Sequence, residues 1–246
     1  VGICPGRTPV VTAPRIGAVV STDNGLHWRD LGTVIDAPPD SMRCDTVNDA
    51  FAGGSGDFSV LLDSGKKYFY FFFDSYHTDV SQQGVCVARM RYADRDAPVG
   101  KVYKWHADTW KEPGLGGRVT TIFPTLTDWH KPNADSFWGP SIHYNTHLRQ
   151  YVILLNHAKD CRWTQEGVYV TFNRDLDKPG AWTKPLKILE GVHYYPQVIG
   201  TNTTARETDK RAGRVARLFV TGKSRWEIVF LRPGEQVPST QPTPGY

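Results

Sequence analysis

The feature that most constrains this chain is an internal repeat. The segment GDFSVLLDSGKKYFYFFFDSY, which starts at Gly56, has the same pattern as WGPSIHYNTHLRQYVILLNHA, which starts at Trp138. Each contains an apolar strand, a polar turn and a second apolar strand, which predicts a β-hairpin. Ser59 and Ser141 hold matching positions, 82 residues apart. A shorter version follows in YYPQVIG, from Tyr194, and in ARLFVTG.

Two further features recur in the same order after the hairpins. QQGVCVARM begins at Gln82 and QEGVYVTFN at Gln165, so both repeats are expected to contain a third strand. A tryptophan then opens a fourth strand, at Trp28, Trp110 and Trp182. Four strands in a fixed order predict four-stranded antiparallel sheets, which are the blades of a β-propeller.

The predicted fold is therefore an all-β propeller in one domain, residues 1–233, followed by a proline-rich tail at 234–246. Blades are expected at about residues 10–40, 56–115, 138–190 and 193–233. The first and last blades are incomplete, whereas a propeller of five blades has about twenty strands. The sequence thus favours a five-bladed type that is incomplete at the N-terminus; four blades with a shared closing sheet are the alternative.

Charge and hydropathy exclude several classes of partner. The net charge of +4 is small and dispersed, and no run of lysine or arginine exceeds two residues, so we expect no nucleic acid. The longest apolar run, YFYFFF at 68–73, has the length of a buried strand, and no segment approaches the ~20 residues of a membrane helix. We therefore expect no membrane partner, and a monomer.

The four cysteines are far apart and have no zinc-binding spacing. Cys86 lies in the alternating strand GVCVARM, where a buried free thiol is expected. Cys4 and Cys44 can form a disulfide if the protein is exported, and the sequence leaves that pairing open.

The stretch STDNGLHW, residues 21–28, resembles the Asp-box S-x-D-x-G-x-x-W of sialidases and other sugar-handling propellers. We expect Asp23 to accept backbone N–H bonds across the turn, Gly25 to adopt a positive φ, and Trp28 to pack between sheets. This role is structural, so the motif indicates architecture and not catalysis.

The blades also resemble those of five-bladed glycoside hydrolases, the arabinanase, xylosidase and levansucrase/invertase group. DFSVLLDSGKKYFYFFFDS is similar to a hairpin of that group, FWGPSIHYN to its W-A-P strand, and GVYVTFNRDLDKPGAWTKPLKIL to its third and fourth strands. The resemblance covers residues 50–230 and implies a sugar substrate, two catalytic carboxyl groups, no required cofactor and a structural Ca²⁺ in the channel. Ser141 stands where the group often has aspartate, and HYYPQV lacks the expected glutamate.

Propeller geometry selects the candidate site residues. Residues just before strand one, just after strand two and at the start of strand three converge at the mouth of the channel. Cleavage of a glycosidic bond needs a proton donor and an ionised carboxylate, and aromatic rings stack on sugar faces. The predicted catalytic residues are Asp57, Glu166, Asp135 and Asp49. The predicted substrate-binding residues are Trp138, Asp74, His157, His193, Tyr195 and Gln197, and no metal ligands are assigned.

Asp57 and Glu166 are the preferred pair. Asp57 lies in the glycine-rich GGSGDFSV and is assigned as base or pKa tuner, with a turn cap as the alternative. Glu166 replaces the Gln83 of the other repeat and is assigned as the acid, with a solvated charge as the alternative. Trp138 is the preferred stacking platform, and core packing is its alternative.

The expected function is thus a glycoside hydrolase acting on a poly- or oligosaccharide. For such a substrate we expect a secreted or periplasmic protein. A non-catalytic carbohydrate-binding propeller and a protein-interaction propeller are the alternatives.

Overall fold

The structure is a computed structural model that describes residues 3–236. Within these residues it is all-β: curled antiparallel sheets are joined by loops and four short 3-10 turns, with no α-helix. The all-β prediction is confirmed. Most of the predicted proline-rich tail, from residue 237 onward, lies outside the described residues. No helix between residues 3 and 236 has the length and apolar character needed to cross a membrane.

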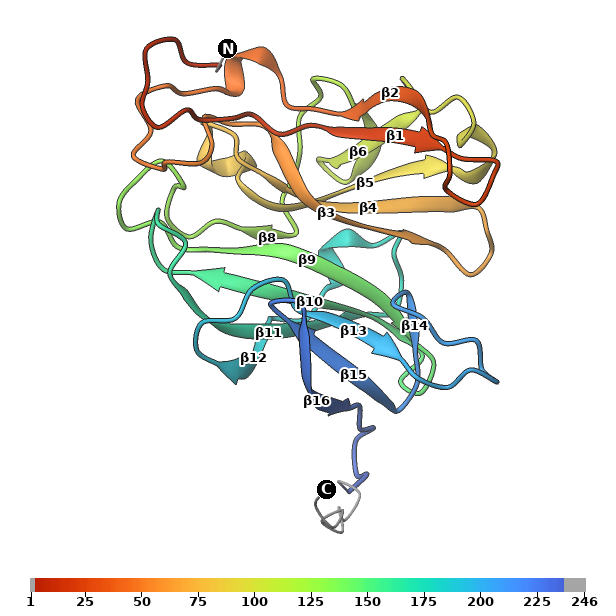
Figure 1. Cartoon of the computed structure of the whole chain (residues 1–246). Helices are drawn as coiled ribbons and strands as arrows, with labels where there is room; N and C mark the ends of the chain where they lie inside the picture. Colours follow the sequence, from red (N-terminus) through yellow and green to blue (C-terminus); the bar gives the residue numbers. More distant parts are fainter. Residues whose placement is uncertain (1–2, 237–246) are drawn as a thin grey trace.

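The strands form four sheets (Figure 1). The first contains β1 (Ile16–Val20) and β2 (Arg29–Ile35). The second contains β3 (Ser55–Leu62), β4 (Tyr68–Ser75), β5 (Gly84–Arg91), β6 (Val102–His106) and β7 (Thr109–Pro113), and β8 (Phe123–Pro124) pairs with β5. The third contains β9 (Ser136–Asn145), β10 (Gln150–Ala158), β11 (Gln165–Asn173) and β12 (Leu186–Glu190), with β14 (Arg211–Ala212) parallel to β9. The fourth contains β13 (Gln197–Gly200), β15 (Val215–Val220) and β16 (Lys223–Val229).

The repeated hairpins have equivalent pairing. β3, β4 and β5 are antiparallel neighbours, and β9, β10 and β11 repeat that order. Ser59 pairs with Phe72, and the matching Ser141 pairs with Leu154, so the two repeats share their register. The hairpin prediction from the sequence is therefore confirmed for both segments.

The prediction for the fourth strands is correct in part. Trp28 directly precedes β2, as expected. In the second sheet, however, β6 is the fourth strand, and Trp110 lies in an additional fifth strand, β7. Trp182 follows a 3-10 turn at Pro179–Ala181 and lies four residues before β12. The tryptophan therefore marks the approach to an outer strand and does not fix where that strand begins.

The run YFYFFF is continuously apolar because β4 is buried on both faces. Successive side chains of a strand point to opposite faces. Tyr70 and Phe72 pack in the apolar layer between the second and third sheets, whereas Phe71 and Phe73 pack against the first sheet. The aromatic run thus fills two layers of the core at once.

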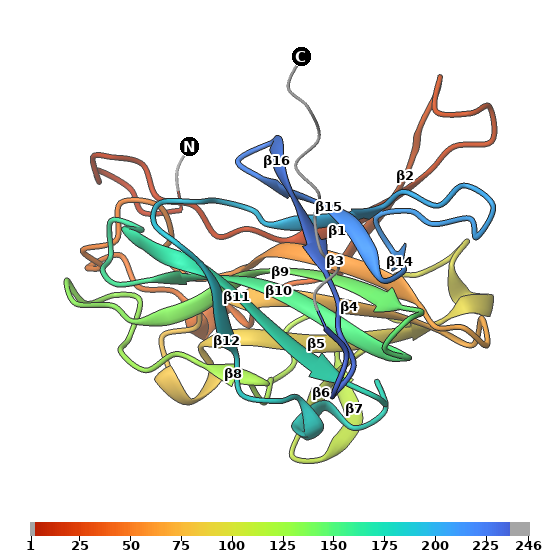
Figure 2. The same ribbon diagram turned by 90° about the horizontal axis from the view of Figure 1, so that it is seen from below.

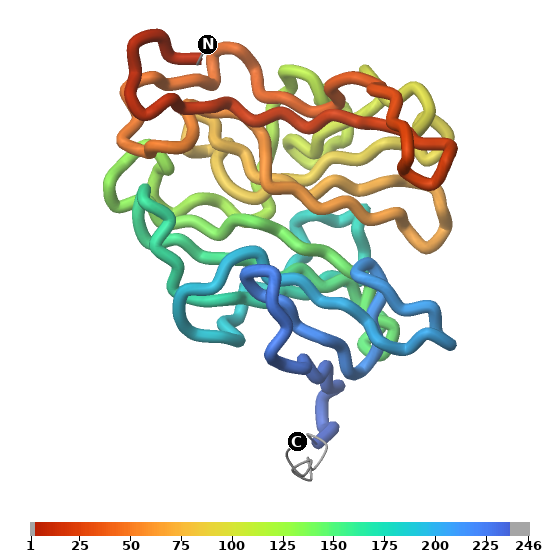
Figure 3. The backbone as a smooth tube through the Cα atoms, viewed as in Figure 1, coloured from red at the N-terminus to blue at the C-terminus, as the bar shows by residue number. Residues whose placement is uncertain are grey.

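The same alternation in β10 joins the third sheet to both neighbours. Ile153 and Leu155 pack toward the second sheet, and Val152 and Leu154 pack toward the fourth. The four sheets are therefore stacked face to face, with three apolar layers between them. Figures 1 and 2 show this succession of sheets in two views. The chain follows this stack in sequence order from the first sheet to the fourth (Figure 3). β1 contacts β3, β3 contacts β9, and β9 contacts β13.

The turn at residues 21–28 has the hydrogen bonds expected of an Asp-box. Asp23 Oδ1 accepts the His27 N–H at 2.9 Å, Ser21 Oγ accepts the Gly25 N–H at 2.9 Å, and Gly25 has a φ of +88°. The expected packing of Trp28 between sheets is wrong, because its side chain is exposed (62%). Its indole N–H instead donates to the carbonyl of Gly25.

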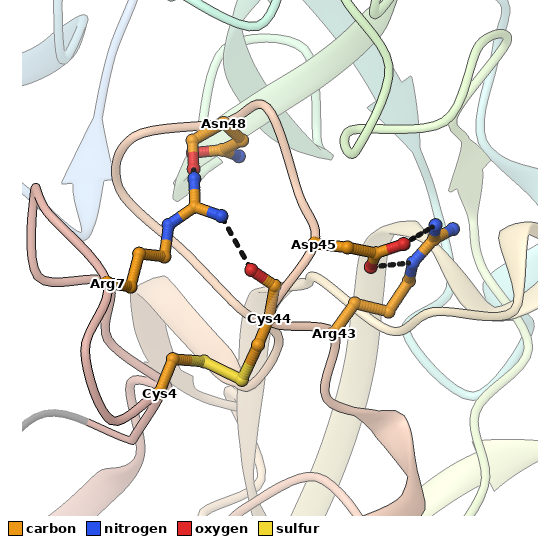
Figure 4. Close-up of a disulfide and its surroundings, with 6 residues drawn as sticks. All are labelled: Cys4, Arg7, Arg43, Cys44, Asp45 and Asn48. Carbon is orange, nitrogen blue, oxygen red and sulfur yellow. Dashed lines mark hydrogen bonds and ion pairs between the residues drawn. A yellow bond between two sulfur atoms is a disulfide. The ribbon is translucent and has the colours of Figure 1, made fainter.

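Cys4 and Cys44 form a disulfide, which settles the pairing that the sequence left open (Figure 4). The bond ties the N-terminal segment to the loop before β3. Arg7 strengthens this link, because its guanidinium donates to the carbonyl of Cys44 at 2.6 Å. Cys86 is a buried free thiol, as expected, and Cys161 is also free and buried.

Candidate functional site

A cavity of about 440 Å³ opens where β3 and β9 meet the start of β13. We call it the Asp57 cavity. The side chains that define it are Asp57, Phe58, Ser59, Tyr195, Gln197 and Lys210.

The local sequence explains the position of Asp57. β3 has a bulge between Gly56 and Ser59, and Asp57 in this bulge has a φ of +40°. A Cβ at Gly54 or Gly56 would lie 2.7 or 2.9 Å from Pro14, so the glycines allow the strand to approach that proline. The glycine-rich segment therefore places a carboxylate in the cavity wall instead of in the sheet ladder.

Two phenols hold the Asp57 carboxylate. The hydroxyl of Tyr76 donates to Asp57 Oδ2 at 2.6 Å, and the hydroxyl of Tyr195 donates to Oδ1 at 3.3 Å. Tyr76 is fully buried behind the cavity, whereas Tyr195 is 57% exposed. Burial, followed by the negative charges of nearby carboxylates, raises the pKa of both phenols, so both remain hydrogen-bond donors at neutral pH.

A second carboxyl group, Asp74, lies behind Asp57 at the end of β4. Its side chain is 1% exposed, and its Oδ2 accepts the Gly139 N–H at 2.8 Å. Oδ1 is buried without a hydrogen-bond partner. Burial, and then the negative charge of Asp57, raises the pKa of Asp74 well above its usual range. This environment favours the protonated acid.

Tyr195 is positioned by a backbone hydrogen bond and by Trp138. Its N–H donates to Asn156 Oδ1 at 2.8 Å, while the Asn156 amide donates to the carbonyl of His193 at 2.6 Å. Trp138 packs edge to face against Tyr195, with ring centroids 5.3 Å apart. Trp138 is only 3% exposed, and its indole N–H donates to Gln165. It therefore packs behind Tyr195 and has no exposed ring face on which a sugar could stack.

Glu166, Asp135 and His157 come together in another cluster, and none of them lines the Asp57 cavity. His157 Nε2 lies 2.7 Å from Asp135 Oδ1, and its Nδ1 lies 3.4 Å from Glu166 Oε1. Lys159 and Lys187 also contact Glu166, at 2.9 and 3.2 Å.

The electrostatics of this cluster do not suit Glu166 as a proton donor. Desolvation favours its protonated form, but hydrogen bonds from Tyr169, Lys159 and Lys187 outweigh that effect and lower the pKa of Glu166 to about 2. Glu166 is therefore ionised at neutral pH, which does not suit the acid role. The alternative of a solvated charge is right about the charge, but the side chain is ion-paired and only 17% exposed.

The remaining predicted residues are dispersed. Asp49 has an exposed side chain 3.7 Å from Arg7 and lies near the disulfide. The His193 ring packs edge to face on Trp226. Its contact with the site is through the backbone carbonyl, which accepts the Asn156 amide. Gln197 is among the residues that line the Asp57 cavity.

Sequence reasoning omitted three of the six side chains that define the cavity: Phe58, Ser59 and Lys210. Lys210 lies in the segment before β14, outside every repeated motif, and only the tertiary structure brings it to the cavity. Phe58 directly follows Asp57 in the chain, and its side chain is 51% exposed at the cavity.

The Ca²⁺ implied by the resemblance does not fit the site. Between residues 3 and 236, no group of three or more His, Cys, Asp or Glu side chains gathers in a geometry that could hold a metal ion. Asp57 is also the one acidic side chain among the described residues that line the cavity.

No known family model matches this sequence, and no curated protein matches it either. Function must therefore be inferred from the fold and from the residues of the Asp57 cavity.

Proposed function

We propose that the four sheets are blades of a β-propeller and that the Asp57 cavity lies at its axis. Two observations support this proposal. The strands β1, β3, β9 and β13, each the first of its sheet in the chain, contact one another in succession. Each pair of successive sheets also encloses an apolar layer, which is how blades pack.

We further propose that the protein is a glycoside hydrolase that acts on a poly- or oligosaccharide in the Asp57 cavity. The observation that carries this proposal is the contrast between Asp57 and Asp74. Asp57 faces the cavity and accepts hydrogen bonds from two phenols. Asp74 lies behind it in an environment that keeps the proton on the carboxyl group. Neighbouring carboxyl groups in opposite environments are typical of sites that use one as base and one as acid.

In this mechanism Asp57 is the group that touches the reacting sugar. Its carboxylate takes a proton from water or attacks the anomeric carbon, and the phenols of Tyr76 and Tyr195 fix its orientation. Asp74 is the protonated partner. The leaving oxygen must receive a proton for the glycosidic bond to break, and Asp74 is the carboxyl group beside Asp57 whose raised pKa favours the protonated form.

The other side chains of the cavity suit a sugar. Phe58 and Tyr195 are exposed aromatic residues, and a pyranose ring presents C–H faces that pack on such rings. Ser59, Ser141 and Gln197 add hydroxyl and amide groups for the sugar hydroxyls. The Cys4–Cys44 disulfide supports an oxidising, extracytoplasmic location, where polysaccharides occur.

A non-catalytic carbohydrate-binding protein is the second candidate, and the burial of Asp74 favours it. A proton donor must reach the glycosidic oxygen, but Asp74 is 1% exposed and does not line the cavity. In that case Asp57 and the aromatic side chains bind a sugar that is not cleaved.

One experiment separates the two candidates. A glycan array identifies the saccharides that bind, and a reducing-sugar assay on those saccharides detects cleavage. For a hydrolase, Asp57→Asn loses turnover by at least about 100-fold while it keeps sugar binding. Glu166→Gln is the matched control, because Glu166 lies outside the cavity, and it retains turnover.

Each outcome is decisive. Sugar binding without any release of reducing ends supports the binding protein and rejects the hydrolase. Full turnover of Asp57→Asn rejects the assignment of Asp57 as base. The absence of binding to every saccharide rejects both candidates.

A further inference from the structure

The Asp57 cavity is lined by a positively charged side chain, Lys210, which cleavage of a neutral sugar does not require. Lys210 lines the cavity and its Nζ donates to Ser59 Oγ at 3.1 Å. Ser59 Oγ also accepts the Ile142 N–H at 3.3 Å, so the hydroxyl beside the ammonium group is held by the third sheet. A lysine from the segment before β14 is thereby fixed against the wall of β3.

The next cavity along β3 is also positively charged. It has a volume of about 490 Å³ and shares Val60 and Lys210 with the Asp57 cavity, so the two adjoin each other. Arg211 lines this second cavity together with the aromatic side chains of Tyr144 and Tyr151. No acidic side chain is among the described residues that line it. The two adjoining cavities therefore contain one negative side chain, Asp57, and two positive ones, Lys210 and Arg211.

The two opposite charges line one cavity, so a single ligand can meet both. Ser59, which holds Lys210, follows Asp57 by two residues on β3. The bulge between Gly56 and Ser59 interrupts the regular strand, and it turns the Asp57 carboxylate into the cavity that Lys210 also lines. A saccharide whose anomeric carbon is at Asp57 can therefore place an anionic substituent near Lys210 in the same cavity.

The present partner of Lys210 does not prevent this role. Lys210 Nζ lies 3.3 Å from Asp209 Oδ2, but both side chains are more than a third exposed. Ion pairs in such positions are weak because water screens them, so a ligand anion can share or replace the aspartate.

From these contacts we infer that the site takes an anionic saccharide, whose carboxylate or sulfate ester binds Lys210 and the Ser59 hydroxyl. This inference rests on the proposed function of the Asp57 cavity and specifies its substrate class. Lys210 is thus a specificity-determining residue, and it takes no part in bond cleavage.

The test compares three oligosaccharides of equal length by isothermal titration calorimetry: a uronic-acid oligomer, a sulfated galactan oligomer and a neutral xylan or arabinan oligomer. Wild type is expected to prefer one anionic oligomer, and the preferred one distinguishes carboxylate from sulfate. Lys210→Met should weaken that binding by about tenfold, because a charge-assisted hydrogen bond is lost, and leave neutral binding unchanged. Lys210→Arg should restore most of the affinity.

Lys178→Met is the matched control, because Lys178 is an exposed lysine outside both cavities. Binding of the preferred anionic oligomer to wild type should weaken as the NaCl concentration is raised, because salt screens its charge interaction with Lys210. Binding to Lys210→Met should depend much less on NaCl. Thermal unfolding of each variant shows that the fold is retained.

The outcomes distinguish the inference from the function on which it rests. Equal binding of anionic and neutral oligomers, unchanged in Lys210→Met, overturns the anionic substrate class while the carbohydrate site stands. No binding of any of the three to wild type rejects the carbohydrate site, and the inference with it.

Discussion

Replacing Asp74 by asparagine distinguishes a buried neutral acid from a buried carboxylate. Asp74 Oδ2 accepts the Gly139 N–H, and asparagine keeps both the size of the side chain and this acceptor. Oδ1 has no hydrogen-bond partner. A protonated carboxyl group and an amide group at this position are therefore expected to have a similar free-energy cost of burial. The variant therefore resembles the protonated acid but cannot ionise.

The sign of the expected effect follows from the raised pKa of Asp74, which burial causes first and the Asp57 charge second. In the unfolded chain aspartate has a pKa of about 3.9. As pH rises from about 4 toward the higher folded-state pKa, the unfolded wild type releases this proton and the folded wild type does not. The free energy of unfolding of wild type therefore falls by about 1.4 kcal/mol per pH unit in this window. Asp74→Asn lacks this loss, so it gains stability relative to wild type over the same window.

The assay is urea unfolding followed by tryptophan fluorescence at several pH values between 4 and 8. Wild type and Asp74→Asn are compared with Asp96→Asn, which changes an exposed carboxyl group and corrects for the general effect of lost charge. A stability difference between wild type and Asp74→Asn that stays constant with pH would show that Asp74 ionises normally. The neutral-acid role in the proposed mechanism would then be wrong.

Three further predictions concern the architecture. Changing both Cys4 and Cys44 to serine should lower the free energy of unfolding by about 4 kcal/mol, because the disulfide closes a 40-residue separation; an unchanged urea midpoint would contradict this. Ile153→Ala should cost about 2–5 kcal/mol in the same assay, because Ile153 is fully buried between the second and third sheets, and a smaller loss would mean that the layer collapses around the cavity. Asp23→Ala should speed hydrogen exchange of the His27 amide without affecting sugar binding. Hydrogen bonds from His27 and Ser21 lower the pKa of Asp23 to about 2. The stabilisation of the wild-type turn by ionised Asp23 should therefore be lost only as pH falls from about 4 to 2. Equal exchange rates of the His27 amide in wild type and Asp23→Ala would refute the role of Asp23 in the turn.

Much of the architecture was predictable because it depends on near neighbours in the chain. The alternation of apolar residues in the repeats defines the hairpins β3–β4 and β9–β10, and the Asp-box defines its turn through contacts within a few residues. The exposed Trp28 was not predictable, because its packing depends on whether another sheet covers that side of β2.

The candidate site was predicted only in part. Asp57 was found through its glycine-rich context, and Tyr195 and Gln197 through their place before and at the start of a strand. Glu166 was assigned by comparison of the repeats, but its ionisation is decided by Tyr169, Lys159 and Lys187. The two lysines lie outside the repeated segment, so the comparison could not find them. The sequence around Trp138 does not distinguish a ring that faces a sugar from one that packs in the core. Its burial in the structure shows that it packs in the core.

The sequence by itself determined that the chain is a set of antiparallel hairpins with one unusual carboxylate at the start of β3. Only the tertiary structure decided what surrounds that carboxylate: the Tyr195 hydroxyl lies 138 residues away along the chain, and Lys210 reaches Ser59 across 151 residues. Strand and turn patterns arise from backbone geometry over a few residues, and for this reason they are legible in the sequence. The charges and hydrogen bonds of the cavity arise from how separate sheets pack, and that packing depends on side chains that are remote from each other in the chain.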